Sequence, residues 1–203
     1  MIEFKNLRID LGDVLVEIVS IVLAILLAFV ISGWHDRTTR HSALHSSLVN
    51  IRQEMTLNQR ALRSVMPVHK RYLAVFTKLL ERNSKSERIT FDQLRAAVQQ
   101  ASSSGFHYAL LQSIAWEITQ NSTAVSDMPY KQRAGLTQIY QGQVFVQSAQ
   151  LKFVNDLFAP NGPPSGNYFY AADVGIGNLG DVVAGEEDLS KIYTAELKLL
   201  PSQ

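Results

Sequence analysis

The stretch VLVEIVSIVLAILLAFVI, residues 14–31, decides the fold of this chain of 203 residues. It holds one charged side chain, Glu17, and one hydroxyl, Ser20. Extended to Trp34 it contains 21 residues. A helix of that length measures roughly 31 Å, which matches the hydrocarbon core of a bilayer. We therefore expect a transmembrane helix over residues 14–34, after a short flank over residues 1–13.

An apolar N-terminal stretch has two other interpretations, a cleaved signal peptide and a core helix buried in protein. A signal peptide usually has an apolar core of about 7–15 residues followed by small residues at the cleavage site. This stretch is longer, and His35, Asp36 and Arg37 follow it. No other segment approaches the length needed to cross a bilayer, so the sequence predicts a single-pass protein.

The residues on either side of the apolar stretch suit the membrane surface. Trp34 fits an aromatic anchor at the interface, and Arg37 and Arg40 are placed to meet phospholipid phosphates. Lys5 and Arg8 lie on the other side, so the positive charge is nearly balanced and favours neither orientation clearly.

One side of the predicted transmembrane helix carries small residues. At about 100° per residue, Ser20, Ala24, Ala28 and Ser32 fall in one sector, and Glu17 projects to its middle. Small residues at this spacing let two membrane helices approach closely, and an intramembrane carboxylate normally faces protein or water. These five residues are our candidate contact with another membrane protein or a second copy. The alternative for Glu17 is hydration at the interface.

Everything after Trp34 is predicted to be helical, so the fold class is mainly α. The transmembrane helix continues into a membrane-proximal helical bundle over residues 35–203. Its first part has a heptad-like apolar stripe that ends at Pro67, with Asn58 at the skipped position: Leu44, Leu48, Ile51, Met55, Leu62 and Val65. The stripe predicts either a coiled-coil stalk that pairs with another copy or, as we favour, a face that packs on the chain's own later helices.

Five later helices are expected in the bundle. Thr90 and Gln93 form a capping-box pattern before one of them, and Pro129 suits the first turn of another. The expected ranges are 68–82, 91–100, 108–121, 127–158 and 178–200, with the longest loop over residues 159–173.

Composition and charge exclude several classes of protein. The chain has 19 Lys plus Arg against 18 Asp plus Glu, whereas nucleic-acid-binding domains are usually strongly basic. The absence of cysteine excludes disulfide scaffolds, zinc ribbons and thiol enzymes. The net charge is +7 over residues 36–95 and −5 over residues 156–198. This asymmetry predicts a basic face over anionic lipid or, as we favour, compensation between the first and last helices.

No motif predicts catalysis. The string GIGNLG at residues 175–180 has dinucleotide-loop spacing, but the sequence leaves no room for the motif's second strand. We expect a flexible glycine-rich entry to the last helix instead. His41 and His45 lie four residues apart without a third metal ligand. We therefore expect no catalytic residue, no cofactor site and no metal site.

Two parts of the sequence resemble a known family. Glu17-Ile18-Val19, the aliphatic run, Trp34 and a later helix with Leu48, Ile51 and Glu54 resemble an uncharacterised bacterial family of single-pass inner-membrane proteins. The central part of related hypothetical proteins is similar at Ala115-Trp116-Glu117, Asp127-Met128-Pro129-Tyr130 and Ile139-Tyr140. The resemblance covers residues 12–150 and carries no assigned chemistry. It implies the bacterial inner membrane and a periplasmic bundle.

The sequence therefore favours a structural or interaction protein over an enzyme. We expect an accessory or scaffold subunit that docks through its membrane helix and bundle, with the bilayer as one partner and no nucleic acid. The alternative is a membrane-anchored sensor that holds a small ligand near Trp116, Tyr140 and the loop over residues 159–173. Trp116 on an apolar helix face is more often a core residue than a ligand platform.

Overall fold

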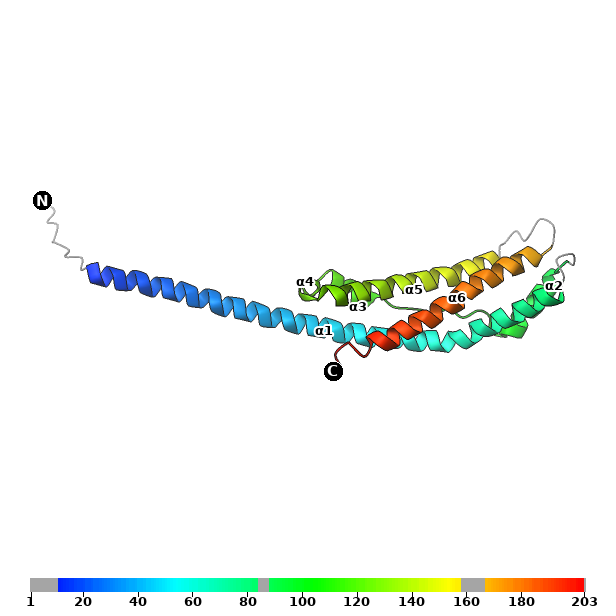
Figure 1. Cartoon of the computed structure of the whole chain (residues 1–203), viewed down its shortest axis with the longest axis horizontal. Helices are drawn as coiled ribbons and strands as arrows, with labels where there is room; N and C mark the ends of the chain where they lie inside the picture. The colour runs from blue at the N-terminus through cyan, green and yellow to red at the C-terminus, as the bar shows by residue number, and fades with distance from the viewer. Residues whose placement is uncertain (1–10, 84–87, 158–166, 203) are drawn as a thin grey trace.

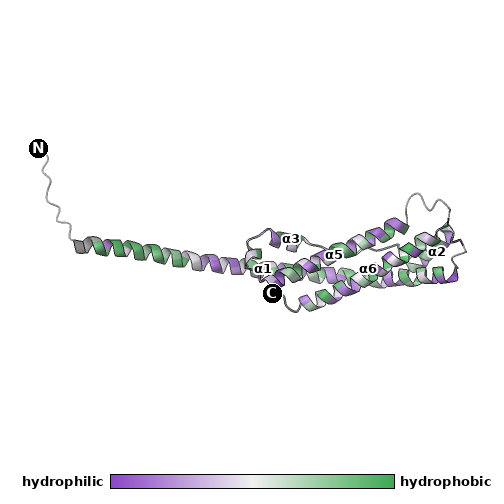
Figure 2. Cartoon of the chain, turned by 45° about the horizontal axis from the view of Figure 1, so that its top comes forward, coloured by the Kyte–Doolittle hydropathy of each residue, from purple (hydrophilic) through white to green (hydrophobic). Residues whose placement is uncertain are grey.

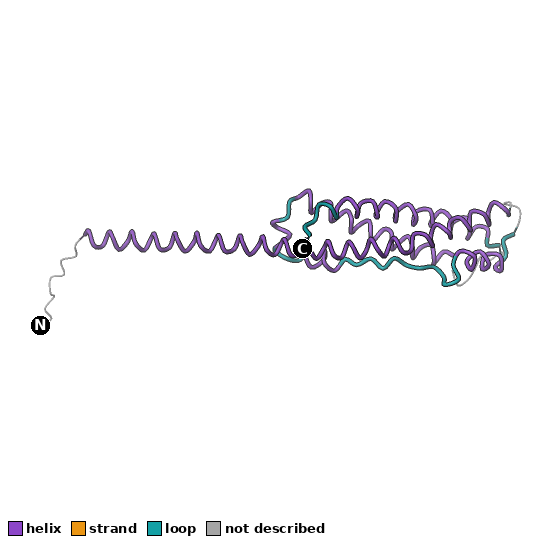
Figure 3. Tube along the Cα trace, turned by 90° about the horizontal axis from the view of Figure 1, so that it is seen from below, coloured by secondary structure: helices purple, strands orange, loops and turns teal. Residues whose placement is uncertain are grey.

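A computed structural model describes residues 11–83, 88–157 and 167–202, with side chains from Leu15 onward. Within these ranges the chain is mainly α-helical and has no strand, as the sequence predicts (Figures 1 and 3). The helices are α1 (Leu11–Arg82), α2 (Phe91–Ala101), α3 (Ile114–Gln120), α4 (Ala124–Asp127), α5 (Tyr130–Leu157) and α6 (Phe169–Glu196).

Helix α1 has two different halves. It contains 72 residues and is about 108 Å long. Residues 15–43 are exposed along their whole length, and the apolar part of this half stands out in green in Figure 2. An 18-residue window here has a mean hydropathy of 2.8 and none of it is buried, so the segment is not the core helix of a bundle. The helix is long and apolar enough to cross a membrane.

The second half of α1 forms the bundle with α5 and α6. Tyr140 of α5 reaches Glu54 of α1, and Phe153 of α5 packs against Phe76, so α5 runs in the same direction as α1. Helix α6 runs the opposite way, because Glu186 contacts His69 whereas the carbonyl oxygen of Leu197 meets Arg52. The short helices α2, α3 and α4 lie along α1.

Two apolar clusters fill the bundle. The proximal core lies nearer the exposed half of α1 and includes buried residues of the predicted stripe together with later helices: Leu48, Ile51, Met55, Leu62, Val65, Trp116, Leu136, Ile139, Tyr140, Leu189 and Tyr193. The distal core includes Tyr72, Phe76, Leu94, Phe153, Leu179 and Val182. The stripe therefore packs on the chain's own helices, as we favoured. Asn58, at its skipped position, is 1% exposed.

The expected helix break at Pro67 is wrong, because α1 continues to Arg82. Pro67 lies on the exposed side of the helix, so its ring meets water rather than a neighbouring helix. The flanking residues Val65 and Tyr72 are buried in the two cores. Their burial offsets the backbone hydrogen bond that a proline removes from a helix interior.

Two other expected boundaries also differ. Helix formation over residues 108–121 is confirmed only for α3, because residues 106–113 run along the bundle without helical structure (Figure 3). Helix α6 begins at Phe169 rather than near residue 178, so residues 175–180 lie inside it. The described part of the expected loop over residues 159–173 is thus largely helical, and residues 159–166 lie outside the described ranges.

Several sequence expectations are confirmed. Thr90 and Gln93 make the reciprocal hydrogen bonds of a capping box at α2. Helix α5 (Tyr130–Leu157) confirms most of the helix expected over residues 127–158, although Pro129 directly precedes its first turn and Asp127 ends the separate helix α4. The acidic last helix packs beside the basic first one, and Lys70 of α1 pairs with Glu187 of α6 at 2.5 Å.

Two glycines of α6 should respond differently to alanine. A Cβ at Gly177 meets open space, so Gly177→Ala should raise the free energy of unfolding by about 0.5–1 kcal/mol through helix propensity. A Cβ at Gly185 lies 3.2 Å from Val146 Cγ2 and 3.3 Å from Phe145 Cε1. Gly185→Ala should therefore lack this gain. Urea unfolding of the full chain in detergent measures both, and equal gains would contradict the close packing of α5 on α6.

Candidate functional site

The predicted membrane contact lies on one side of an unbroken helix. Ser20, Ala24, Ala28 and Ser32 recur every four residues along α1, and Glu17 lies one turn before Ser20. All five side chains are exposed. The Ser20 hydroxyl donates to the carbonyl oxygen of Val16 at 2.8 Å, which satisfies it within the helix. The small-residue face is therefore present and contacts no other helix of this chain in the described ranges.

The predicted interface anchors follow directly. Trp34 is 71% exposed, and Arg37 and Arg40 are exposed on the next turns. The hydroxyls of Thr38 and Thr39 donate to the carbonyl oxygens four residues earlier, at 3.0 Å each, so they add no unsatisfied polar group near the end of the apolar stretch.

The bundle interior contains a polar arrangement that the sequence analysis missed. Residues 106–113, hereafter the connector, lie between α1 and α5, and side chains of both helices hydrogen-bond its backbone. The Asn58 side chain both donates to and accepts from the backbone of Gln112, at 2.7 and 2.8 Å. Gln147 donates to the carbonyl oxygen of Leu111, and Gln150 accepts from the amide of Ala109, both at 3.1 Å. These bonds replace the ladder that a helix or strand would supply.

At the centre of this arrangement lies a buried pair, His69 of α1 and Glu186 of α6. Both side chains are 0% exposed, and His69 Nδ1 lies 2.7 Å from Glu186 Oε1. Gln150 Nε2 donates to the same oxygen at 2.7 Å, and the His69 ring stacks on Phe106 with centroids 4.3 Å apart. The pair thus joins α1, α5, α6 and the connector at one point.

The geometry fixes the number of protons on this pair. His69 Nε2 lies 2.6 Å from the carbonyl oxygen of His107, which only accepts, so Nε2 carries a hydrogen. The short contact between Nδ1 and Glu186 Oε1 requires a second hydrogen between them. The pair therefore has no net charge, whichever atom holds that shared hydrogen. A buried pair without net charge avoids the desolvation cost of an isolated ion.

A second buried carboxyl, Glu54, binds the start of α3. Its Oε2 accepts from the amide of Ala115 at 2.7 Å, and its Oε1 accepts from the Tyr140 hydroxyl at 2.6 Å. The Tyr140 ring stacks on Trp116 with centroids 5.6 Å apart. Burial raises the pKa of Tyr140 strongly, and the hydrogen bond and negative charge of Glu54 raise it further. Burial also raises the pKa of Tyr193, which lies in the same core.

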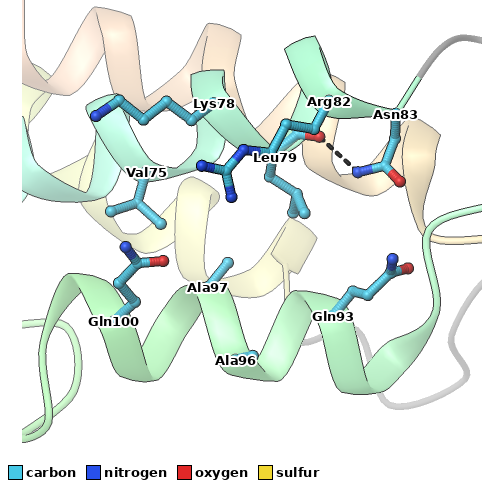
Figure 4. Close-up of a pocket in the computed structure, with 9 residues that line it drawn as sticks. All are labelled: Val75, Lys78, Leu79, Arg82, Asn83, Gln93, Ala96, Ala97 and Gln100. Atoms are coloured by element: carbon cyan, nitrogen blue, oxygen red, sulfur yellow. Dashed lines mark hydrogen bonds between the residues drawn. The ribbon is translucent and has the colours of Figure 1, made fainter.

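Among the described residues, those proposed for a bound ligand do not line one cavity. Trp116 is 4% exposed and belongs to the proximal core with Tyr140, whereas Tyr168 packs on the distal core. This arrangement confirms Trp116 as a core residue. The groove between α1 and α2 in Figure 4 has a volume of about 340 Å³. Its lining includes Lys78, Arg82 and Gln100 but none of the proposed ligand residues.

The remaining motifs also have structural explanations. Gly175 lies against Phe153 where α6 crosses α5, inside a continuous helix, so residues 175–180 are not a phosphate-binding loop and not a flexible entry. His41 and His45 are exposed on α1. In the part of the chain that the structure describes, no three His, Asp or Glu side chains gather into a metal-binding group.

The missed residues follow a pattern visible only in part in the sequence. Asn58 stands at a core position of an apolar stripe, which marks it as a polar residue with a structural role. His69, Gln150 and Glu186 are likewise buried polar residues, on α1, α5 and α6 respectively. The apolar faces that contain them are hard to recognise in the sequence, because Pro67 and the glycines of α6 suggest helix ends at points where α1 and α6 continue.

No family model matches the chain, no curated protein matches it, and no solved structure matches it. The sequence resemblance and the functional interpretation therefore depend on the chain's own residues.

The His69–Glu186 pair should show strong thermodynamic coupling. His69→Phe leaves a buried carboxyl without its partner and should cost about 3–5 kcal/mol of unfolding free energy. The double variant His69→Phe/Glu186→Leu should cost less than the two single variants together, because no unpaired buried charge remains. Urea unfolding measures the cycle. The exposed pair Lys70–Glu187, on adjacent residues of the same helices, is the matched control and should be nearly additive. Additive costs at His69 and Glu186 would contradict the shared-proton pair.

The buried tyrosines should make the fold sensitive to alkaline pH. Because folding raises the pKa of Tyr140 above its ordinary value of 10.0, the folded state keeps this proton longer than the unfolded state does. The part of the unfolding free energy that comes from this pKa difference should therefore be fully present below pH 10 and be lost as the pH rises further. Tyrosinate absorbance recorded with circular dichroism checks this, and Tyr140→Phe should lose less stability over the same range. Ionisation of all seven tyrosines with the helices intact would contradict the burial of Tyr140 and Tyr193.

Proposed function

We propose that this chain is a single-pass protein of the bacterial inner membrane that acts as an accessory or scaffold subunit, without catalysis. The observation that carries the proposal is the exposed apolar half of α1, which continues without interruption into a wall of the bundle. The resemblance of residues 12–150 to bacterial inner-membrane proteins supports a bundle on the periplasmic side.

The exposed apolar half of α1 needs a nonaqueous environment. Large side chains such as Ile21, Leu27 and Phe29 are about half to three-quarters exposed, at 54%, 60% and 71%. Soluble monomers rarely expose continuous apolar surfaces of this extent. In a bilayer these side chains contact lipid, and the backbone needs no external partner because it is helical.

The small-residue face supports docking to another membrane helix. Ser20, Ala24, Ala28 and Ser32 allow close approach of a partner, whereas Phe29 on the opposite side suits lipid. Glu17 near the start of the stretch gains a hydrogen-bond partner or hydration in this arrangement. The proposed partner is another membrane protein or a second copy of this chain.

The join between the two halves of α1 supports a mechanical role. Residues 35–66 contain neither glycine nor proline and are helical throughout. The same helix is then fixed to α6 by the His69–Glu186 pair and by Arg52, whose Nη1 donates to the carbonyl oxygens of Leu197 and Leu200. A partner that rotates or tilts the membrane helix therefore moves the bundle with it.

A photo-crosslinker at position 24 tests the docking face in native membranes. Ala24 on the small-residue face should give one discrete product, either at twice the monomer mass or with one membrane protein that also copurifies at fixed ratio. Phe29, on the lipid side, is the matched control and should give several-fold less of that product. Equal, diffuse labelling from both positions would contradict docking through this face.

A further inference from the structure

The end of the bundle that faces the membrane segment is formed by α4, the start of α5, the end of α6 and the described residues that follow it (Figure 1). Because α5 runs in the same direction as α1 and Tyr140 meets Glu54, Tyr130 lies about level with Leu44. Leu44 is ten residues beyond Trp34, which corresponds to about 15 Å along the helix. The first turn of α5 is therefore the part of this helix nearest to the bilayer that we propose α1 crosses.

This end of the bundle is basic and carries an exposed aromatic ring. Tyr130 is 78% exposed, and Lys131 and Arg133 are exposed beside it. The first turn of α5 contains no acidic residue, and two acids lie near it: Asp127 at the end of α4, and Glu196 of α6, which lines the same groove as Tyr130 and Lys131. An aromatic ring next to cationic side chains is the composition of a membrane–water interface.

Within the described ranges, the cations at this end have no ion-pair partner, a property they share with Arg60, Arg63 and Arg71 farther along α1. Lys70 pairs with Glu187, Lys152 with Asp156 and Lys191 with Asp188, all farther from the membrane segment. Among the described residues, no acidic side chain lies within ion-pair distance of Lys131 or Arg133, nor of Arg37 or Arg40 on α1. Four cations without an ion-pair partner in the described part of the chain therefore lie near this end, two on α1 and two on the first turn of α5.

The direction of α5 also suits an anionic surface. Side chains of a helix tilt toward its N-terminus, which in α5 is the end nearest the membrane segment. The same end carries the positive pole of the helix dipole. The side chains of Tyr130, Lys131 and Arg133 therefore lean toward the end of the bundle that is nearest the membrane segment.

We propose that the start of α5, through Tyr130, Lys131 and Arg133, rests on the anionic headgroup surface of the bilayer that α1 crosses. This contact rests on the proposed membrane anchor. The headgroup layer adds about 5–7 Å beyond the hydrocarbon. A tilt of about 20° toward α5, typical of membrane helices, lowers this end by about 3 Å or more. The distance that remains between the start of α5 and the headgroup layer is about the length of an extended lysine or tyrosine side chain. The contact fixes the tilt of α1 and the orientation of the bundle.

Fluorescent labels at single cysteines test this contact, because the natural chain has no cysteine. The full chain is placed in nanodiscs of phosphatidylcholine with or without phosphatidylglycerol, with a nitroxide quencher on the headgroup or the acyl chain. Tyr130→Cys reports the proposed contact. Tyr170→Cys is the matched control, since Tyr170 is 75% exposed at the far end of the bundle. Phe29→Cys reports the membrane span itself.

We expect the headgroup quencher to act at position 130 in phosphatidylglycerol and not at position 170. Lys131→Gln and Arg133→Gln should each lower the ratio of docked to free bundle about fivefold. Quenching at position 29 without quenching at position 130 would overturn the contact and leave the anchor standing. Equal quenching at position 130 with and without phosphatidylglycerol would overturn the role of anionic headgroups. Absence of acyl-chain quenching at position 29 would overturn the anchor as well.

Discussion

Backbone N–H and C=O groups that are removed from water need hydrogen-bond partners, and this requirement shapes both halves of the molecule. In the exposed apolar half of α1 the helix supplies every interior partner itself, as a membrane demands. The connector is not helical, so Asn58 and His69 from α1 and Gln147 and Gln150 from α5 supply partners for its backbone. The buried polar residues of the bundle therefore allow a nonhelical segment to run between two helices.

The sequence predicts the parts of this architecture that depend on periodicity and local capping. The apolar stretch, the stripe that packs in the proximal core and the Thr90 cap of α2 are all local patterns. The failures occur where tertiary packing overrides a local signal. Burial on both sides of Pro67 keeps α1 helical, and the contact of Gly175 with Phe153 explains one glycine inside α6. The His69–Glu186 pair was not predictable, because it joins residues 117 positions apart on helices whose relative register the sequence does not specify.

The two halves of α1 differ in their surroundings. The exposed half presents a small-residue face and a lipid face, whereas the other half is fixed in a bundle with two filled cores. Lys70–Glu187 and the Arg52 contacts attach α6 to α1 along its length. An interaction made by the proposed membrane helix would therefore act on the whole bundle, which is the basis of the proposed scaffold role.

The central claim is that α1 is one continuous helix from the proposed membrane span into the bundle. Spin labels at Phe29→Cys and Ser64→Cys, both exposed positions, test it by pulsed dipolar spectroscopy of the full chain in nanodiscs. A continuous helix over these 35 residues predicts a single narrow distance of about 53 Å. A broad or markedly shorter distribution would show a joint between the two halves and would contradict the account.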